Sequence, residues 1–471
     1  MKNRSIMWNF FYQASYQLLV VMLPVITVPI VSRALQPEGI GTWNYVSSIV
    51  SYFTLVAGLG LSSYGVREIA FVRDDKHQLS RKFWEIQGFN LFFSSFVFII
   101  YIIYALLSPY KVLFLLQAMV VFATLLDISW FFQGIEDFKR ISLINTLVKI
   151  MTLILTVLLV REKNDLNAYV GIIGLSSLAS GLAFWIFIRG KIKWIKVSPK
   201  EMLAHFKPAL SFFIVKAAAT LFNNLNKTIL GIMTTMSLVG MFSNSLVMIM
   251  LITAIVNSLN TVLLPRMSSL QKENQESEMI DLLGKAIDIQ VFMASGCMFI
   301  TLGIIRGVVE LFLGSSFIDV THIVPILVPV MLLSSIEQAI ANMYLVPKNK
   351  MKSYTRSIII ATLINVLLCF VLIPRLGAHG AAFSYTAGQL YLALSRVTVL
   401  IRDTTYRFNF ENLFLCFLSG SVALFAIKII SSVNLNIFML TFLQGLVGLT
   451  VYILFTFLLH VNPMVNVLKQ K

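Results

Sequence analysis

Two lysines stand inside one apolar stretch of the sequence, residues 208–233. Lys216 and Lys227 would each cost roughly 2.5 to 3.5 kcal/mol at the centre of a helix that faces lipid, so we expect both to face protein or water. Thr220, Asn223 and Lys227 lie within about 40° of the direction of Lys216, in a polar stripe about 16 Å long. This stripe could line a water-filled cavity that binds an anion. Alternatively, Lys227 extends its ammonium group to the membrane surface and Lys216 pairs with a neighbouring carboxylate.

Other charged residues also fall within apolar stretches. Asp127 and Lys149 lie at similar depths on consecutive spans, which predicts a structural ion pair between them. Arg396 lies near the end of its span, where its guanidinium can extend to the membrane surface. Glu337 is deeper and has no obvious partner, so it is either the counter-ion of a cavity lysine or a coupling site for protons or sodium.

The composition identifies the class of protein. Of the 471 residues, 58% are hydrophobic and 12% are charged, whereas charged residues make up about 25% of an ordinary soluble protein. The three cysteines lie far apart in apolar runs and the five histidines are scattered. We therefore expect no disulfide framework, no metal site and no cofactor. The sequence is that of an integral membrane protein of the all-α class.

At about 20 apolar residues per crossing, the sequence predicts about 14 transmembrane helices. They are expected at 8–32, 40–62, 84–107, 112–133, 141–160, 167–188, 208–233, 238–264, 286–305, 321–346, 355–374, 379–401, 411–430 and 436–460. Lysines and arginines are concentrated in every second connection, which places both the N and C termini in the cytoplasm. The formal net charge of +16 then faces the anionic inner leaflet, and no nucleic acid is implied.

The spans show a weak internal repeat. The start of the second span aligns with the start of the eighth, which pairs Gly41 with Gly240. An even number of helices separates the copies, so the repeats are related by an axis along the membrane normal. We expect two pseudo-symmetric six-helix lobes, residues 1–205 and 206–402, followed by a C-terminal helix pair, residues 403–471.

Two helix starts can be predicted in the basic connections. Ser198 is expected to cap a short helix in the linker 189–207, with Pro199 at its first position. Ser80 is expected to cap the helix that continues into the third span. Both connections are interpreted as leaflet-facing surface segments.

Prolines predict bends in two spans. Pro24 and Pro29 fall in the first span, and Pro325 and Pro329 fall in the tenth. A proline removes a backbone donor and bends a helix. In a transporter such bends can act as hinges, whereas in many membrane helices they are only kinks.

Several stretches resemble one known family. They are residues 18–70, DISWFFQGIEDFKRI (127–141), NDLNAY (164–169), LVPKNKMKSY (345–354) and LIPRLGAHGAAF (372–383). In this order and spacing the chain resembles the polysaccharide repeat-unit flippases (Wzx type) of the multidrug/oligosaccharidyl-lipid/polysaccharide exporter superfamily. The similarity runs through spans one to twelve. One departure is Gln36, where the family pattern has glycine in the turn after the first span.

The resemblance implies a two-lobed transporter of the cell membrane. Its cargo would be an oligosaccharide linked to undecaprenyl pyrophosphate, moved from the inner to the outer leaflet by alternating access for capsule, exopolysaccharide or O-antigen biosynthesis. A polymerase and glycosyltransferases of the same pathway would be its partners. The first, second, seventh and eighth spans would line the cavity, where the candidate substrate-binding residues are Gln13, Gln17, Asn44, Lys216, Asn223, Lys227 and Asn244. Arg33 would contact the pyrophosphate or a headgroup, or else stabilise the outer turn.

Two other functions were considered from the residues. A drug or cation antiporter of the same superfamily would need acidic residues in its cavity, whereas the seventh span carries lysines. A membrane polysaccharide polymerase or ligase would need catalytic carboxylates or arginines in a long outer loop, and every predicted outer connection is short. No GxxxxGK[ST] motif is present. We therefore expect a transporter that is not an enzyme.

Overall fold

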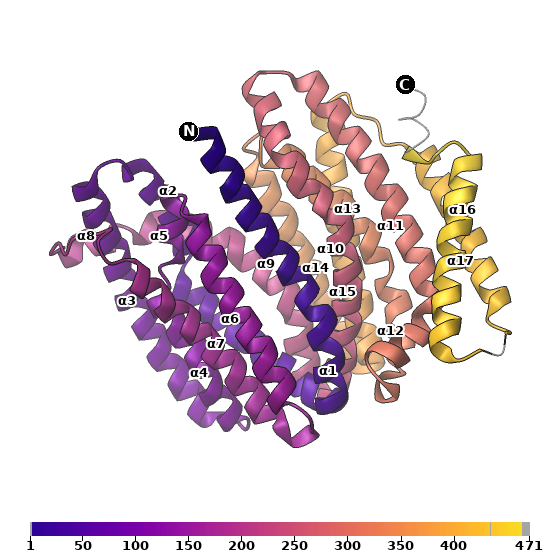
Figure 1. Cartoon of the computed structure of the whole chain (residues 1–471), viewed down its shortest axis with the longest axis horizontal. Helices are drawn as coiled ribbons and strands as arrows, with labels where there is room; N and C mark the ends of the chain where they lie inside the picture. The colour runs from indigo at the N-terminus through magenta and orange to yellow at the C-terminus, as the bar shows by residue number, and fades with distance from the viewer. Residues whose placement is uncertain (1, 434, 464–471) are drawn as a thin grey trace. The chain divides into compact units, whose positions relative to one another are not determined.

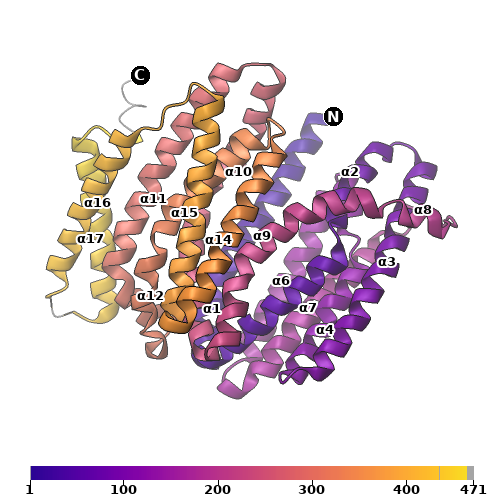
Figure 2. The same ribbon diagram turned by 180° about the vertical axis from the view of Figure 1, so that it is seen from behind.

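Helices form every regular element within residues 2–433 and 435–463, the part of the chain that the computed structural model describes (Figures 1 and 2). At residues 2–11, 13 and 14 it describes the backbone alone. The chain forms two compact units, residues 1–228 and 229–471. The predicted all-α fold is confirmed, while the predicted boundaries at 205 and 402 stay predictions.

The first unit contains the helices from α1 to α8 and most of α9, whose last residues belong to the second unit. Its elements are α1 (Lys2–Gly58), α2 (Leu61–Val72), α3 (Lys76–Leu107), α4 (Lys111–Leu126), α5 (Ser129–Gly134), α6 (Phe138–Leu159), the 3₁₀ helix η1 (Lys163–Asp165), α7 (Leu166–Phe187), α8 (Pro199–Leu203) and α9 (Phe206–Met233). Helices α3, α4, α7 and α6 lie side by side in both views, and α1 packs on α3, α4 and α6 (Figures 1 and 2).

The second unit contains the remaining helices. Its elements are α10 (Met236–Lys272), α11 (Glu276–Phe312), the 3₁₀ helix η2 (Ser315–Phe317), α12 (Val320–Leu327), α13 (Pro329–Ile340), the π-helix η3 (Ala341–Leu345), α14 (Met351–Leu376), α15 (Ala378–Asp403), α16 (Phe410–Ile430) and α17 (Ile437–Leu458). Glycines bring the C-terminal pair close to α11, since Gly303 faces Ile427 of α16 and Gly296 faces Tyr452 of α17. The predicted C-terminal pair is therefore packed on α11 of this unit.

Twelve helical segments of the described residues are long and apolar enough to cross a membrane. Two differences separate this number from the predicted fourteen. The first and second predicted spans belong to one continuous segment, Ser15–Val72. Helix α15, the predicted twelfth span, has 26 residues but a more polar sequence and is not among the twelve. The count of fourteen crossings and the side of the termini stay predictions.

Helix α1 departs from helical geometry at Gln36, where φ is 59° and ψ is 173°. Almost only glycine adopts such angles without strain, which explains why glycine is expected there. The Gln36 side chain stabilises the turn, because its Nε2 donates a hydrogen bond to the Arg33 carbonyl at 2.7 Å. Pro24 and Pro29 lie inside α1 away from this break. The change of direction between the first two spans is thus set at Gln36, the residue before Pro37, and not at Pro24 or Pro29.

The predicted tenth span is divided into three elements. Pro325 lies inside α12 and Pro329 is the first residue of α13, but Val328 between the two helices keeps helical backbone angles, so the predicted bends at these prolines stay predictions. The π-helical turn η3 follows α13 directly. Such turns are rare and often occur at functional positions.

Helix α3 begins one turn earlier than expected. Asp75 is its N-cap, and the Asp75 carboxylate accepts hydrogen bonds from the backbone N–H groups of His77 and Gln78. The bonds from Gln78 and His77 hold the pKa of this carboxyl below its usual value. The predicted cap at Ser80 is wrong, because the Ser80 side chain is buried within α3 and bonds to the Lys76 carbonyl.

Helix α8 confirms the other predicted helix start. Ser198 caps it, Pro199 is its first residue, and the carboxylate of Glu201 accepts a hydrogen bond from the Ser198 backbone at 2.7 Å. This reciprocal capping satisfies two backbone donors that a short helix would otherwise leave free.

Candidate functional site

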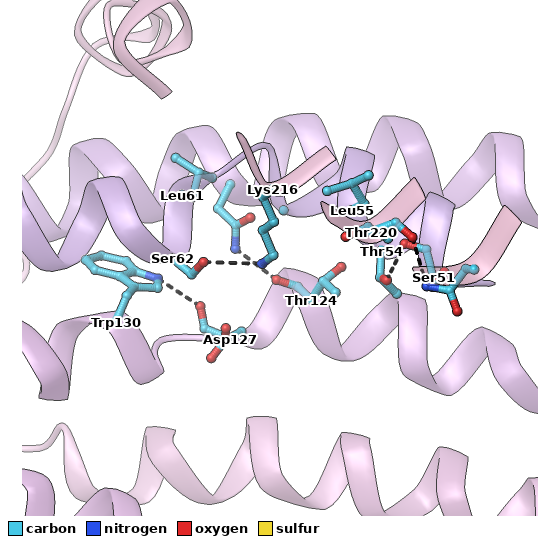
Figure 3. Close-up of a pocket in the computed structure, with 13 residues that line it drawn as sticks. Ser51, Thr54, Leu55, Leu61, Ser62, Thr124, Asp127, Trp130, Lys216 and Thr220 are labelled. Carbon is cyan, nitrogen blue, oxygen red and sulfur yellow. Dashed lines mark hydrogen bonds between the residues drawn. The ribbon is translucent and has the colours of Figure 1, made fainter. Parts of the chain in front are cut away.

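A polar pocket of about 370 Å³ lies within the first unit, between α1, α2, α3, the end of α4, α5 and α9 (Figure 3). Its lining combines hydroxyl and amide side chains with two charged residues. The lining consists of Ser51, Thr54, Leu55, Gly58, Leu61, Ser62, Asn90, Thr124, Asp127, Trp130, Lys216, Thr220 and Asn224. The pocket offers one cation, one anion and many neutral hydrogen-bonding groups.

A helix break forms one wall of the pocket. Helix α4 ends at Leu126 because Asp127 adopts an extended conformation and its carboxylate accepts a hydrogen bond from the Ser129 backbone at 2.9 Å. A break inside an apolar span leaves carbonyl groups that must find donors. Those of residues 124–127 accept hydrogen bonds from the side chains of Asn90, Gln87, Trp185 and Trp130. The sequence predicted one unbroken span here, although Asp127 followed by Ser129 is a recognisable turn signal.

The turn between α1 and α2 forms the opposite wall. Gly60 has a positive φ of 71°, and a Cβ atom there would lie 2.6 Å from the backbone nitrogen of Phe213 in α9. Only glycine fits both requirements. This close approach brings Ser62 to α9, where the Lys216 ammonium donates a hydrogen bond to the Ser62 hydroxyl at 3.4 Å (Figure 3).

Helix α9 contributes a face that differs from the predicted stripe. Lys216 and Thr220 line the pocket as part of that stripe, but the third lining residue is Asn224, not Asn223. Successive steps of four residues rotate the face by about 40° each, so the pocket follows Lys216, Thr220 and Asn224. Asn223 is exposed and Lys227 is half-buried, and neither lines this pocket.

The predicted ion pair between Asp127 and Lys149 is not formed. Asp127 follows the broken end of α4 and lines the pocket, whereas Lys149 is exposed on α6. The expectation failed because it assumed two continuous helices, and the break turns the carboxylate toward Ser129. Asp127 and Lys216 line the same pocket. Among the described residues, these two do not form an ion pair with each other.

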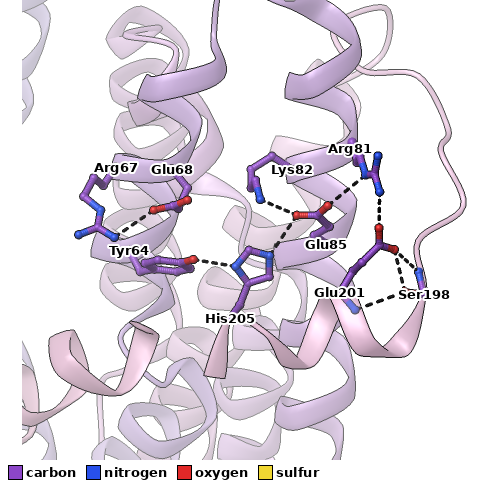
Figure 4. Close-up of polar contacts among 9 residues, drawn as sticks. All are labelled: Tyr64, Arg67, Glu68, Arg81, Lys82, Glu85, Ser198, Glu201 and His205. Carbon is purple, nitrogen blue, oxygen red and sulfur yellow. Dashed lines mark hydrogen bonds and ion pairs between the residues drawn. The ribbon is translucent and has the colours of Figure 1, made fainter. Parts of the chain in front are cut away.

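A buried polar cluster anchors the start of α9 (Figure 4). His205, directly before α9, contacts the Tyr64 hydroxyl through Nδ1 at 2.7 Å and the Glu85 carboxylate through Nε2 at 3.2 Å. Glu85 is also paired with Lys82 at 2.6 Å and with Arg81 at 3.3 Å. The cluster joins α2 and α3 to α9 about three turns before Lys216, so it positions that lysine.

The second unit contains a buried ion pair that the sequence did not reveal. Arg396 of α15 and Glu337 of α13 are 3% and 5% exposed and form an ion pair, and Arg396 Nη1 also donates to the Glu337 carbonyl at 3.1 Å. The counter-ion of Glu337 is therefore Arg396 and not a lysine of the seventh span. The expectation that Arg396 reaches the membrane surface is wrong. Its side chain is buried against Glu337, and its guanidinium lies over the Tyr354 ring, 4.6 Å from the ring centroid.

The remaining predicted site residues are dispersed. The side chain of Gln13 lies outside the described part of the structure, and Gln17 and Arg33 are exposed on α1. Asn44 bonds to the Ile40 carbonyl of its own helix at 2.9 Å, and Asn244 is buried in the second unit. Their roles in binding stay predictions.

Several pocket residues were missed from the sequence. Ser51, Thr54 and Gly58 recur at helical spacing in the second span, so their polar stripe was a signal that could have been found. Asn90 and Thr124 gave no such signal, since only the fold brings α3 and α4 to the pocket. Among the described residues, no group of three His, Cys, Asp or Glu side chains could hold a metal ion.

Comparison with known proteins places this chain among polysaccharide biosynthesis proteins. The model of the family described as "Polysaccharide biosynthesis protein" matches residues 6–271, more than half of the chain. The "Putative O-antigen transporter" of Escherichia coli is 23% identical over 85% of this chain and 97% of its own length. "Capsular polysaccharide biosynthesis protein CapF" of Staphylococcus aureus is 21% identical over 82% of this chain and 97% of its own length.

The fold is also known from a solved structure. The structure titled "Lipid II flippase MurJ, inward closed conformation" matches with a TM-score of 0.78 over 96% of this chain and 99% of that chain, at 16% sequence identity. The apolar helices, the shared fold and the family match agree with one another. The chain is a multi-pass membrane protein and belongs to the polysaccharide biosynthesis protein family.

Proposed function

We propose that the chain is a flippase for oligosaccharide repeat units linked to undecaprenyl pyrophosphate. It moves them from the inner to the outer leaflet of the cell membrane by alternating access, for capsule, exopolysaccharide or O-antigen biosynthesis. A polymerase and glycosyltransferases of the same pathway use or supply the cargo. The names of the Escherichia coli relative and of the MurJ structure, an O-antigen transporter and a lipid II flippase, support this proposal.

The observation that carries the proposal is the polar pocket around Lys216, which lies between apolar helices of a membrane protein. A lipid-linked pyrophosphate brings about two negative charges and a polar glycan, which must leave water while the lipid tail stays in the bilayer. An ammonium group forms strong charge-assisted hydrogen bonds with phosphate oxygens. The hydroxyl and amide groups of Ser62, Thr220 and Asn224 supply neutral partners for sugar hydroxyls.

The decisive experiment asks which leaflet holds the cargo. The gene is deleted, lipid-linked oligosaccharides are extracted, and intact cells are probed with an external glycosidase. Complete repeat units protected on the inner face, and exposed again after the wild-type gene is restored, are the expected result. A cargo that is already exposed outside in the deletion strain, or that does not accumulate, would contradict the flippase.

Asp127 is the observation that favours a second candidate, a drug or cation antiporter. Its carboxylate lines the same pocket, and an acidic residue is what such a pump requires. Binding of a cationic dye to the purified protein, measured with wild type and with Asp127→Asn, discriminates between the two. Dye binding that is lost in Asp127→Asn supports the antiporter, whereas the flippase predicts no specific dye binding in either protein.

A further inference from the structure

The linker between α7 and α9 is held firmly against the first turns of α3. The Lys193 backbone N–H donates to the Ser80 hydroxyl at 3.0 Å, and Trp84 Nε1 donates to the Lys193 carbonyl at 3.0 Å. Farther along, Arg81 of α3 forms an ion pair with Glu201 of α8 (Figure 4). The outward side chains of the linker therefore project from a fixed backbone.

These outward side chains carry a surplus of positive charge. The acidic residue of the linker, Glu201, is neutralised by Arg81, and Lys191 is paired with Asp137. Five further basic residues of the linker are exposed and have no ion pair within the part of the chain that the structure describes; they are Arg189, Lys193, Lys196, Lys200 and Lys207. Their charge has to be balanced by something outside the protein.

Large apolar side chains are exposed among these cations. Trp194 is 76% exposed although its ring contacts the ring of Trp84 at 4.3 Å, and Leu203 is 54% exposed. Tryptophan beside lysine and arginine is typical of the interface between bilayer and water, where the indole lies among the headgroups. The combination fits neither bulk water nor the hydrocarbon core.

We propose that residues 189–207 form a binding surface for anionic phospholipid headgroups. The five unpaired basic residues contact the phosphates, and Trp194 and Leu203 enter the headgroup layer. The attraction is electrostatic, so it weakens as salt is added. This surface is separate from the pocket around Lys216, and the inference stands whether or not the proposed cargo is correct.

The test uses the full chain, purified in a neutral detergent and titrated with phosphatidylglycerol or phosphatidylcholine while bound lipid is counted by native mass spectrometry. The test variant is Lys193→Gln/Lys196→Gln/Lys200→Gln. The matched control, Lys272→Gln/Lys352→Gln/Lys428→Gln, removes the same charge from exposed lysines elsewhere. All six positions are exposed, so both variants should keep the melting temperature of the wild type in detergent alone.

The expected result is that wild type and control bind phosphatidylglycerol better than phosphatidylcholine, and that the linker variant loses this preference by about tenfold or more. Trp194→Ala should weaken binding of both lipids. Equal phosphatidylglycerol binding by wild type and the linker variant, or an equal loss in the control, would overturn the proposal. Displacement of the bound lipid by inorganic pyrophosphate at constant ionic strength would also overturn it, since the surface would then be a phosphate site.

Discussion

Individual side chains acquire their roles here from what surrounds them in three dimensions. Within the part of the chain that the structure describes, the Lys216 ammonium has one hydrogen bond, to the Ser62 hydroxyl at 3.4 Å, and no ion pair, so its charge is available to a ligand. Arg396, which sequence position alone placed near a membrane surface, is buried against Glu337 and Tyr354. Two cations of similar sequence context thus have different chemistry.

Lys216→Ala should reduce export of repeat units by about ten- to a hundredfold, because a charge-assisted hydrogen bond to phosphate contributes about 1.5–3 kcal/mol. Lys216→Arg should retain part of the activity. Lys149→Ala is the matched control, since Lys149 is also a lysine of an apolar span but is exposed outside the pocket. The measurement is the fraction of repeat units accessible to external glycosidase at equal protein level. Normal export with Lys216→Ala would remove this lysine from the site.

Two neighbouring asparagines separate the pocket from the predicted stripe. Asn224 lines the pocket and Asn223 does not. Asn224→Ala should therefore lower export about two- to tenfold, because one neutral hydrogen bond contributes about 0.5–1.5 kcal/mol, while Asn223→Ala should leave export near the wild-type level. The same glycosidase assay measures both variants. The reverse order of effects would show that the cargo meets the Asn223 face of α9 instead.

The helices themselves are interrupted where the fold needs a turn or a polar group. Helix α1 turns at Gln36, and α4 ends before Asp127. The length of the apolar runs predicts the spans, because a chain that crosses the bilayer as a helix satisfies its own backbone groups. It does not locate the interruptions, since these depend on partners such as Asn90 and Trp185 that come from distant helices.

The strained turn at Gln36 should respond to the size and branching of its side chain. Gln36→Val should lower the free energy of unfolding by about 1–3 kcal/mol, because a β-branched residue is disfavoured at positive φ. Gln36→Gly should be more stable than Gln36→Val by about the same amount, because glycine adopts this backbone conformation without strain. Melting temperatures in detergent measure the change, and Gln17→Val, at an exposed glutamine of the same helix, is the control. Equal melting temperatures for the valine and glycine variants at position 36 would contradict the strain.

The Glu337–Arg396 pair should hold α13 to α15. Glu337→Gln leaves the Arg396 charge buried without a counter-ion and should destabilise the protein by about 3–5 kcal/mol. The double change Glu337→Gln/Arg396→Met removes both charges and should recover most of that loss. Thermal unfolding of the three proteins decides between this structural role and ion coupling. If Glu337→Gln melts normally but loses a dependence of transport on pH or sodium, Glu337 is a coupling site.

At the scale of the whole molecule, the membrane potential can supply the energy for transport, and no nucleotide site is needed. Two negative charges that move outward across an inside-negative potential of 100 mV gain about 4.6 kcal/mol. Transport by proteoliposomes should therefore become faster as a potassium diffusion potential is made more negative on the side where the cargo starts. Reversing the potential should slow it, and a rate that ignores the potential would show that the cargo crosses with its charge already neutralised.

The sequence was sufficient for the class, the approximate spans and the family, because burial of about 20 apolar residues per crossing and the turn motifs are local properties. It also located Lys216, since a charge in an apolar run is visible without a structure. The partners of each charge were decided by the tertiary structure. Asp127 does not pair with Lys149, because helix α4 ends just before Asp127. Glu337 pairs with Arg396, which lies 59 residues away in the sequence. Such pairings depend on which helices pack together and how each is rotated, and neither is encoded by local periodicity.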